Sequence, residues 1–170
     1  MQRIAKFEKV SFSQFEKDFI KNFGECFDVK AIYEGIKLPK RATTGSAGYD
    51  FFAPVDLKLQ KGSTLLVPTG IRASINEGWV LNIFPRSGLG FKHRLQLDNT
   101  VGIIDSDYYF SSNEGHIMIK ISCDAFDDGH SLEVECGNGF AQGLFLPYGI
   151  TTDDEVTEIR DGGFGSTTKS

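Results

Sequence analysis

Glycine and hydroxyl-bearing residues are concentrated at the end of the chain, in RDGGFGSTTKS at positions 160–170. Glycine lets backbone N–H groups approach an anion, and the hydroxyls of Ser166 and Thr167 can donate to phosphate oxygens. A P-loop would need Gly-Lys-Ser/Thr and then a helix whose first amides complete the phosphate site. Thr168 stands where the second glycine should be, and no residues for such a helix follow Ser170. We therefore expect a phosphate-binding segment of another kind.

A frayed, solvated terminus is the alternative interpretation of this glycine-rich segment. Phe164 argues against that alternative, because an aromatic side chain in a solvated tail contributes nothing unless it docks on something.

Three further segments place polar residues where a plain turn or strand would suffice. PRSGLG offers the guanidinium of Arg86, the hydroxyl of Ser87 and the backbone amide of Gly88, a grouping suited to phosphate. Asp50 enters an aromatic strand in AGYDFFAP, and Gln142 interrupts an apolar strand in GFAQGLFLPY. Taken alone, each segment is more simply explained as a turn or a strand edge.

A carboxylate next to an apolar run marks the segment DNTVGIIDSDYYF at positions 98–110. Asn99 and Asp105 flank TVGII, and Tyr108 follows. A carboxylate between apolar residues and a tyrosine is well placed to orient a water molecule, so Asp105 is the candidate general base.

The elements that must position these residues are mostly strands. Residues 28–160 consist of short apolar runs separated by Gly, Pro, Asn and Asp, with turn signals every 8 to 12 residues. This pattern predicts an all-β sandwich or jelly roll rather than βαβ units.

One amphipathic helix is predicted over residues 11–24, SFSQFEKDFIKNFG. Its phenylalanines recur at helical spacing on one face. Ser13 and Glu16 have capping-box spacing, and Gly24 is a plausible end.

Composition excludes several classes of protein. With 170 residues and a formal net charge of −5, we expect one domain and no nucleic-acid-binding surface. Cys26, Cys123 and Cys136 lack metal-ligand spacing, and the histidines are scattered, which argues against a zinc site and suits a reducing compartment. The apolar runs are short and MQRIAKFEKV has no signal-peptide core, so we expect a cytoplasmic protein that neither crosses nor binds a membrane.

Taken in order, these segments resemble the trimeric dUTPase family (deoxyuridine 5'-triphosphate nucleotidohydrolase). The resemblance runs from about Leu38 to Thr168. Its five motifs correspond to LPKRATTGSAGYD, PRSGLG, GIIDSDY, AQG and GGFGST. Five motifs in the right order form a far more specific signal than any one of them.

The resemblance implies an all-β, distorted jelly-roll or β-clip fold with a short N-terminal helix and a flexible C-terminal arm. The chain would divide into a helical extension (1–27), a β domain (28–159) and a glycine-rich lid (160–170).

The resemblance further implies a cytoplasmic homotrimer with shared active sites, as in a phage or a bacterium. It would hydrolyse dUTP to dUMP and pyrophosphate, which limits uracil in DNA and supplies dUMP. The triphosphate would chelate Mg²⁺ without a direct protein ligand, and Asp50 would lie near the hydrated ion.

The resemblance also assigns roles to individual residues. Asp105 would be the general base that orients the water attacking the α-phosphorus. Tyr108 would pack beneath the deoxyribose and leave no room for a 2'-hydroxyl, and Phe164 would stack over the uracil. The residues that would recognise the uracil edge are Asn99 and the hairpin backbone through Gly102 and Ile104. The residues that would bind the phosphates are Arg86, Ser87, Gly88, Gln142, Arg160, Gly165, Ser166 and Thr167.

The chain departs from the family pattern in three places. Arg160 lies four residues before Phe164, where the family usually has five. Tyr109 and Phe110 stand where the family often has a polar residue and glycine, and SSNEG follows as an insertion. The N-terminal helix is also extra.

Two alternatives share the fold. A dCTP deaminase would need a glutamate in the strand after the third motif, but the similar stretch GHIMIKI has Lys120 there. A regulatory module would act through a protein partner, and the extra helix and the insertion favour it. The presence of Asp105, Tyr108 and Phe164 favours the hydrolase, because binding alone requires no positioned base.

Overall fold

The computed structural model describes residues 2–124, 131–158 and 160. The predicted site residues Phe164, Gly165, Ser166 and Thr167 lie outside this part of the chain.

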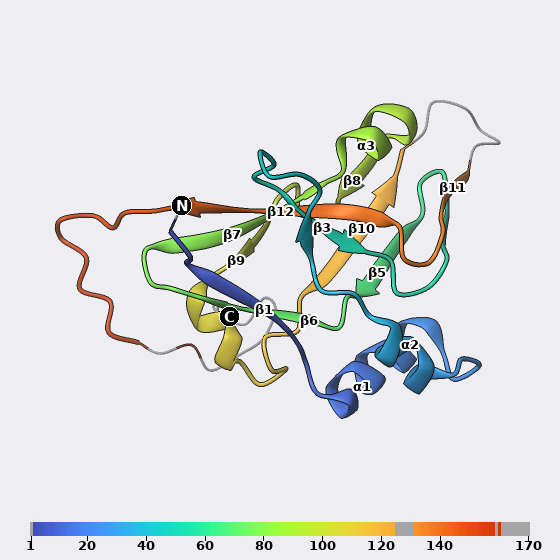
Figure 1. Ribbon diagram of the computed structural model, residues 1–170, viewed down its shortest axis with the longest axis horizontal. Helices are drawn as coiled ribbons and strands as arrows, with labels where there is room; N and C mark the ends of the chain where they lie inside the picture. Colours follow the sequence, from blue (N-terminus) through green and yellow to red (C-terminus); the bar gives the residue numbers. More distant parts are fainter. Residues whose placement is uncertain (1, 125–130, 159, 161–170) are drawn as a thin grey trace.

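The described chain is mostly β with short helices, which confirms the all-β, jelly-roll-like prediction (Figure 1). The strands are β1 (Ala5–Lys9), β2 (Lys40–Arg41), β3 (Tyr49–Phe52), β4 (Leu57–Gln60), β5 (Thr64–Pro68), β6 (Ile71–Ile75), β7 (Trp79–Pro85), β8 (Leu95–Leu97), β9 (Gly102–Ile104), β10 (Met118–Cys123), β11 (Ser131–Val134) and β12 (Gly139–Pro147). The helices are α1 (Phe12–Phe23), α2 (Val29–Gly35), α3 (Ser87–His93) and the 3₁₀ helix η1 (Ser106–Phe110). None of the described helices is long and apolar enough to cross a membrane.

The strands pair into four small sheets. The largest has the order β2-β3-β12-β7-β9, and a second has the order β5-β10-β8. The remaining pairs are β4 with β11 and β1 with β6. Alternating strand residues such as Leu57 and Leu59 of β4 point inward and are buried, whereas their neighbours are exposed, as the period of a half-buried strand requires.

The predicted helix over residues 11–24 is confirmed, but its first turn differs from the expectation. Ser11, not Ser13, is the N-cap, and its hydroxyl accepts a hydrogen bond from the Gln14 amide. Gly24 ends the helix with φ of 83°, as expected for a left-handed terminal residue. Phe15 and Phe19 are fully buried, so α1 is part of the core rather than an appendage.

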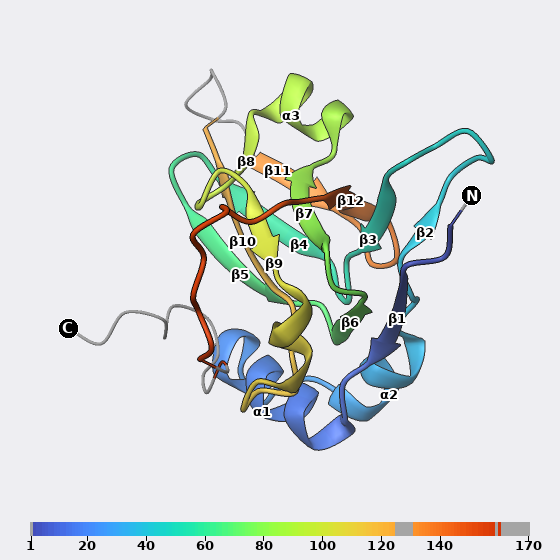
Figure 2. The same ribbon diagram turned by 90° about the vertical axis from the view of Figure 1, so that its left-hand side faces the viewer.

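Three elements were not expected from the sequence. β1 precedes α1 and pairs antiparallel with β6, and α2 interrupts the region expected to be all strands. PRSGLG, whose simplest sequence interpretation was a turn, instead leads into helix α3, which begins at Ser87 after extended Arg86 and ends at left-handed Arg94. In both ribbon views α1 and α2 lie at one end of the molecule and α3 lies at the other (Figures 1 and 2).

Candidate active site

Strand β12 brings several of the predicted phosphate-binding residues together. Its residue Gln142 lies opposite Asp50 of β3 on one side and Phe84 of β7 on the other. β7 ends at Pro85, whose carbonyl oxygen accepts a hydrogen bond from Gln142 Nε2 at 3.2 Å. Arg86 follows at once. We call Asp50, Arg86, Ser87, Gly88 and Gln142 the Arg86 cluster.

Arg86 is directed across the sheet toward Asp50. Its Nε lies 3.3 Å from Asp50 Oδ1. A Cβ on Gly139 would come within 2.9 Å of Arg86 Nη1, so a side chain there would displace the guanidinium. The Arg86 side chain remains 44% exposed, so its guanidinium is still open to an anion.

A cavity of about 400 Å³ lies beside the start of α3. Arg86, Ser87, Gly88 and Lys92 contribute to its lining. The first amides of a helix lack intrahelical acceptors, so this lining combines backbone donors with two basic side chains. The arrangement is suited to phosphate oxygens.

The described residues contain no group of three or more His, Cys, Asp or Glu side chains that could hold a metal ion. Asp50 is therefore the carboxylate of the Arg86 cluster available to an ion. Mg²⁺ commonly binds through one or two carboxylates, substrate phosphates and water, so this donor set fits an ion that arrives with a triphosphate.

A tight hairpin positions the predicted uracil-binding residues. The Val101 amide donates to the Asn99 carbonyl at 2.7 Å, and Thr100 is left-handed with φ of 66°. The hairpin leads into β9, where Gly102 pairs with Ile83 of β7. Asn99, Gly102 and Ile104 all line a mostly apolar cavity of about 310 Å³. The structure thus places these three residues at one pocket.

Asp105 lies at the end of β9, where η1 begins. Its Oδ2 atom is 2.6 Å from Arg160 Nη2, and Arg160 Nε is 3.0 Å from Asp107 Oδ1. The Asp105 side chain is 48% exposed, so water can still reach the carboxylate. Arg160 is therefore bound to the carboxylates of its own chain.

Tyr108 of η1 is buried and held at its hydroxyl. The hydroxyl donates to the His116 carbonyl at 2.9 Å and accepts from Asn113 Nδ2 at 2.8 Å. Burial raises the pKa of this phenol above its ordinary value. The Arg160 guanidinium lies 5.7 Å from the ring centroid. We call Asn99, Gly102, Ile104, Asp105 and Tyr108 the Asp105 cluster.

Arg86 and Asp105 lie toward opposite ends of β7, whereas Gly102 of the Asp105 cluster pairs with Ile83 between them. Arg86 follows the last residue of β7, whereas Asp105 follows Ile104, which pairs with Leu81 near the other end. Six residues of strand at about 3.3 Å each separate these positions by roughly 20 Å. In Figure 2, α3 lies beyond one end of β7, and the arrow of β9 points away from α3. One copy of the chain does not bring Arg86 and Asp105 together.

Sequence reasoning missed the polar residues that support Tyr108. His116 is fully buried and lies 2.6 Å from Asp18 of α1, and Asn113 contacts the tyrosine hydroxyl. The weak signal in the sequence was the polar run SSNEGH directly before an apolar strand.

Comparison with known proteins identifies the family. The family model described as dUTPase matches residues 34–168. The deoxyuridine 5'-triphosphate nucleotidohydrolase of Lactococcus lactis subsp. lactis (strain IL1403) is 40% identical over 146 residues, covering 83% of this chain and 95% of the relative. That of Haemophilus ducreyi (strain 35000HP / ATCC 700724) is 41% identical over 140 residues, covering 78% and 87%. This chain therefore belongs to the dUTPase family.

Solved structures agree with this assignment. The crystal structure of dUTPase from Streptococcus mutans matches with a TM-score of 0.63 at 34% identity, covering 85% of this chain and 97% of that chain. A mutant dUTPase from phage phi11 of S. aureus, described as coordinating a structural Mg(II) ion, has a TM-score of 0.64 at 20% identity, covering 92% and 98%. The second likeness shows the shared fold.

Proposed function

We propose that this chain hydrolyses dUTP to dUMP and pyrophosphate at sites that several copies of the chain build together. The observation that carries the proposal is the separation of Arg86 from Asp105 by about 20 Å along β7. A general base and the groups that bind the reacting phosphate must both lie within hydrogen-bonding reach of it. A neighbouring copy can supply the missing cluster, and a homotrimer, the usual assembly of the family, meets this requirement with three equivalent sites.

Asp105 is the proposed general base for the attacking water. A carboxylate is a weak base compared with the oxygen of the hydroxide that it would help to form. General-base catalysis typically contributes about 10²–10⁴-fold. Most of the acceleration must therefore come from charge stabilisation by the Arg86 guanidinium and the amides at the start of α3.

Mg²⁺ bound to the triphosphate supplies further neutralisation of the phosphate charge. Asp50 is the residue proposed to lie near the hydrated ion. The Mg(II) described for the phage phi11 relative supports a role for this ion in the family.

Base and sugar recognition are assigned to the Asp105 cluster. Asn99 and the backbone from Gly102 to Ile104 would recognise the uracil edge, and the hairpin would close against the 5-position and exclude thymine. An analogue that mispairs leaves buried polar groups unsatisfied, which supports discrimination against cytosine. Tyr108, held at its hydroxyl, is proposed to pack beneath the deoxyribose and exclude a 2'-hydroxyl.

The segment at 160–170 is proposed to close over the bound nucleotide on a neighbouring copy. Phe164 would stack on the uracil, a contact worth roughly 1–3 kcal/mol. Gly165, Ser166 and Thr167 would bind the phosphates. The pairing of Arg160 with Asp105 implies that Arg160 must leave this carboxylate before it can reach a phosphate.

The proposal is tested by pyrophosphate release from dUTP, dCTP, dTTP and UTP side by side, with and without Mg²⁺. Release from dUTP alone, dependent on Mg²⁺, is the expected result. The same assay on a chain that ends at Arg160 should show little release while the assembly stays folded by circular dichroism. No release from any nucleotide, with dUTP still bound, would instead favour a regulatory module.

A further inference from the structure

We call the segment Ser111–His116 the support turn. It makes hydrogen bonds to both the side-chain hydroxyl and the backbone carbonyl of Tyr108. The Tyr108 hydroxyl contacts the His116 carbonyl and Asn113 Nδ2 at 2.9 and 2.8 Å. The Ser111 hydroxyl donates to the Tyr108 carbonyl at 2.6 Å. Any displacement of the support turn must therefore move the tyrosine.

The support turn is packed directly against the backbone of η1. Two successive residues, Glu114 and Gly115, adopt left-handed conformations with φ of 58° and 69°. A Cβ on Gly115 would come within 2.8 Å of both the Tyr108 carbonyl oxygen and Tyr109 Cα. No side chain fits between the support turn and η1, so the two segments are in backbone contact.

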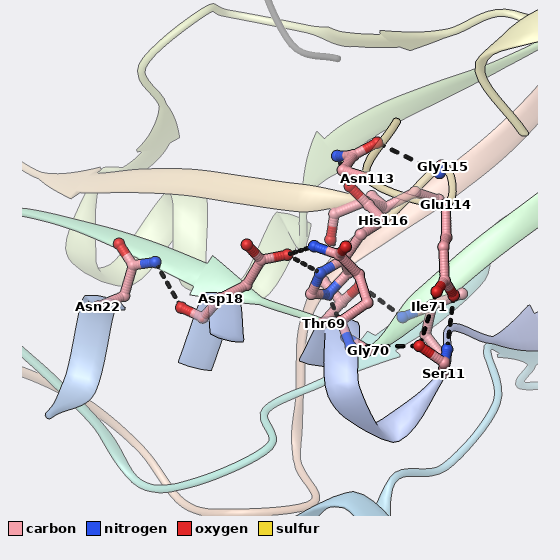
Figure 3. Close-up of polar contacts among 12 residues, drawn as sticks. Ser11, Asp18, Asn22, Thr69, Gly70, Ile71, Asn113, Glu114, Gly115 and His116 are labelled. Atoms are coloured by element: carbon pink, nitrogen blue, oxygen red, sulfur yellow. Dashed lines mark hydrogen bonds and ion pairs between the residues drawn. The ribbon is translucent and has the colours of Figure 1, made fainter. Parts of the chain in front are cut away.

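Helix α1 holds the other side of the support turn through His116 (Figure 3). His116 Nδ1 lies 2.6 Å from Asp18 Oδ2, and the Gly70 amide donates to Nε2 at 2.8 Å. A backbone amide can only donate, so Nε2 is the acceptor and Nδ1 carries the proton given to Asp18. The neutral ring thus connects α1 with the loop before β6 in one fixed orientation.

Two further contacts join the N-terminal segment to the same region. Glu114 accepts from both the amide and the hydroxyl of Ser11, at 2.7 and 2.6 Å (Figure 3). The Tyr109 hydroxyl donates to Glu8 Oε2 of β1 at 2.6 Å, while the Arg72 guanidinium lies 4.2 Å from the Tyr109 ring centroid. Charge-assisted bonds of this kind are short and well oriented.

These contacts could serve only to fix α1 on the body of the protein. Their distribution argues against that alternative, because Glu8, Ser11 and Asp18 come from three different positions of the N-terminal segment and all reach residues 109–116. Buried apolar contacts of Phe15 and Phe19 already anchor the helix.

We infer that the N-terminal segment, through Asp18 and His116, positions Tyr108 for sugar discrimination. His116 and Asn113 are positioning residues, since they act through the tyrosine. The inference rests on the proposed function, which places Tyr108 beneath the deoxyribose, and it assigns a role to both the extra helix and the inserted SSNEG.

The test compares Asp18→Ala, Asp18→Asn and Asn113→Ala with the wild-type chain. The first readout is the ratio of kcat/KM for dUTP to that for UTP. The Ala variants should lower this ratio by about tenfold, because small displacements of a positioning group have large effects on the reacting geometry. Asp18→Asn retains an oxygen that accepts from His116 Nδ1–H and should recover most of the ratio.

The second readout, amide hydrogen exchange of residues 105–116 without nucleotide, does not depend on the identity of the substrate. Exchange should be faster in both Ala variants. Glu16→Ala is the matched control, since residues two apart on a helix do not face the same side. It should change neither readout.

The outcomes separate this inference from the proposed function. If the Ala variants only melt at lower temperature and keep both the wild-type ratio and the wild-type exchange, the inference is wrong. Faster exchange with an unchanged ratio also overturns it. A wild-type chain that cannot hydrolyse dUTP overturns the proposed function and the sugar-selectivity inference with it, whatever the exchange shows.

Discussion

Asp105 combines two properties that a base needs. It is fixed at the end of a strand, and it is half exposed although Arg160 lies against it. The guanidinium keeps the carboxylate oriented, and the exposed part remains open to water. A carboxylate fully buried by its partner could not meet an incoming water molecule.

Asp105→Asn should lower kcat by about 10²–10⁴-fold, the usual contribution of a general base. The amide keeps the shape of the side chain and one acceptor oxygen, so affinity for dUTP should stay close to that of the wild-type chain. Pyrophosphate release gives kcat, and calorimetry on the inactive variant gives the affinity.

Asp107→Asn is the matched control, because Asp107 also contacts Arg160 but lies two residues further along η1. Its kcat should stay close to the wild-type value. A parallel loss of affinity and turnover in Asp105→Asn would remove Asp105 from the role of base.

At the residue scale, the sequence revealed side-chain types but not their partners. The order of the motifs pointed to Asp105, Arg86 and Gln142, because polar residues there interrupt apolar strands. The pairing of Arg160 with Asp105 joins positions 55 residues apart. Such a contact depends on the path of the chain after β12, which no local pattern encodes.

At the scale of helices and strands, the sequence predicted those elements whose apolar residues recur with a clear helical or strand period. The apolar stripe and Gly24 predicted α1, and alternation predicted strands such as β4 and β11. β1 was missed because AKFEK contains no fully buried residue and becomes a strand only by pairing with β6. α2 was missed because seven residues provide too little periodicity for a helix.

Acid should weaken the junction between α1 and the support turn. Hydrogen bonds from the Ser11 hydroxyl and amide lower the pKa of Glu114 below its ordinary value of 4.5. Burial acts to raise the pKa of Asp18, but hydrogen bonds from His116 and Gln14 outweigh it, so this pKa also lies below its ordinary value. A carboxylate whose pKa is lower in the folded than in the unfolded protein stabilises the fold at pH values above its unfolded-state pKa. This stabilisation is lost as the pH falls through the folded-state pKa.

Glu114→Gln should therefore lower Tm by a few degrees at pH 7, and the difference from wild type should shrink as the pH falls below about 4.5. Melting curves at pH 7, 5 and 3 measure this difference. Glu16→Gln is the control, because the described structure shows no hydrogen bond to its carboxylate. A deficit in Glu114→Gln that is constant across this pH range would show that its charge contributes nothing.

At the scale of the whole molecule, β7 separates the two halves of the proposed site. The sequence placed both clusters in one site only through family resemblance. The separation of Arg86 from Asp105 within one copy follows from the antiparallel pairing of β7 with β9, because Arg86 follows the last residue of β7 and Asp105 follows the last residue of β9. No sequence pattern could have given this register.

A mixing experiment tests whether copies share sites. Arg86→Ala and Asp105→Asn should each be nearly inactive alone, because the first lacks the guanidinium that binds phosphate and the second lacks the general base. Unfolding and refolding them together in equal amounts should restore about a quarter of the wild-type sites, since a random assembly pairs an intact cluster of each kind at that frequency. Refolding each variant alone is the control. Recovery no greater than the sum of the two separate variants would mean that each site belongs to one chain.

The residues matched by the family model are fewer than the residues that the folded core requires. The match begins at residue 34, yet Phe15 and Phe19 are fully enclosed by the rest of the protein. Removing a buried phenylalanine side chain costs about 3–5 kcal/mol, against a total stability of roughly 5–15 kcal/mol for a typical domain. A chain shortened to residues 34–168, the part that the family model matches, would lose both phenylalanines. The smallest part of this chain that we expect to fold alone is therefore longer than the family match. The N-terminal residues contribute to its core as a central strand does.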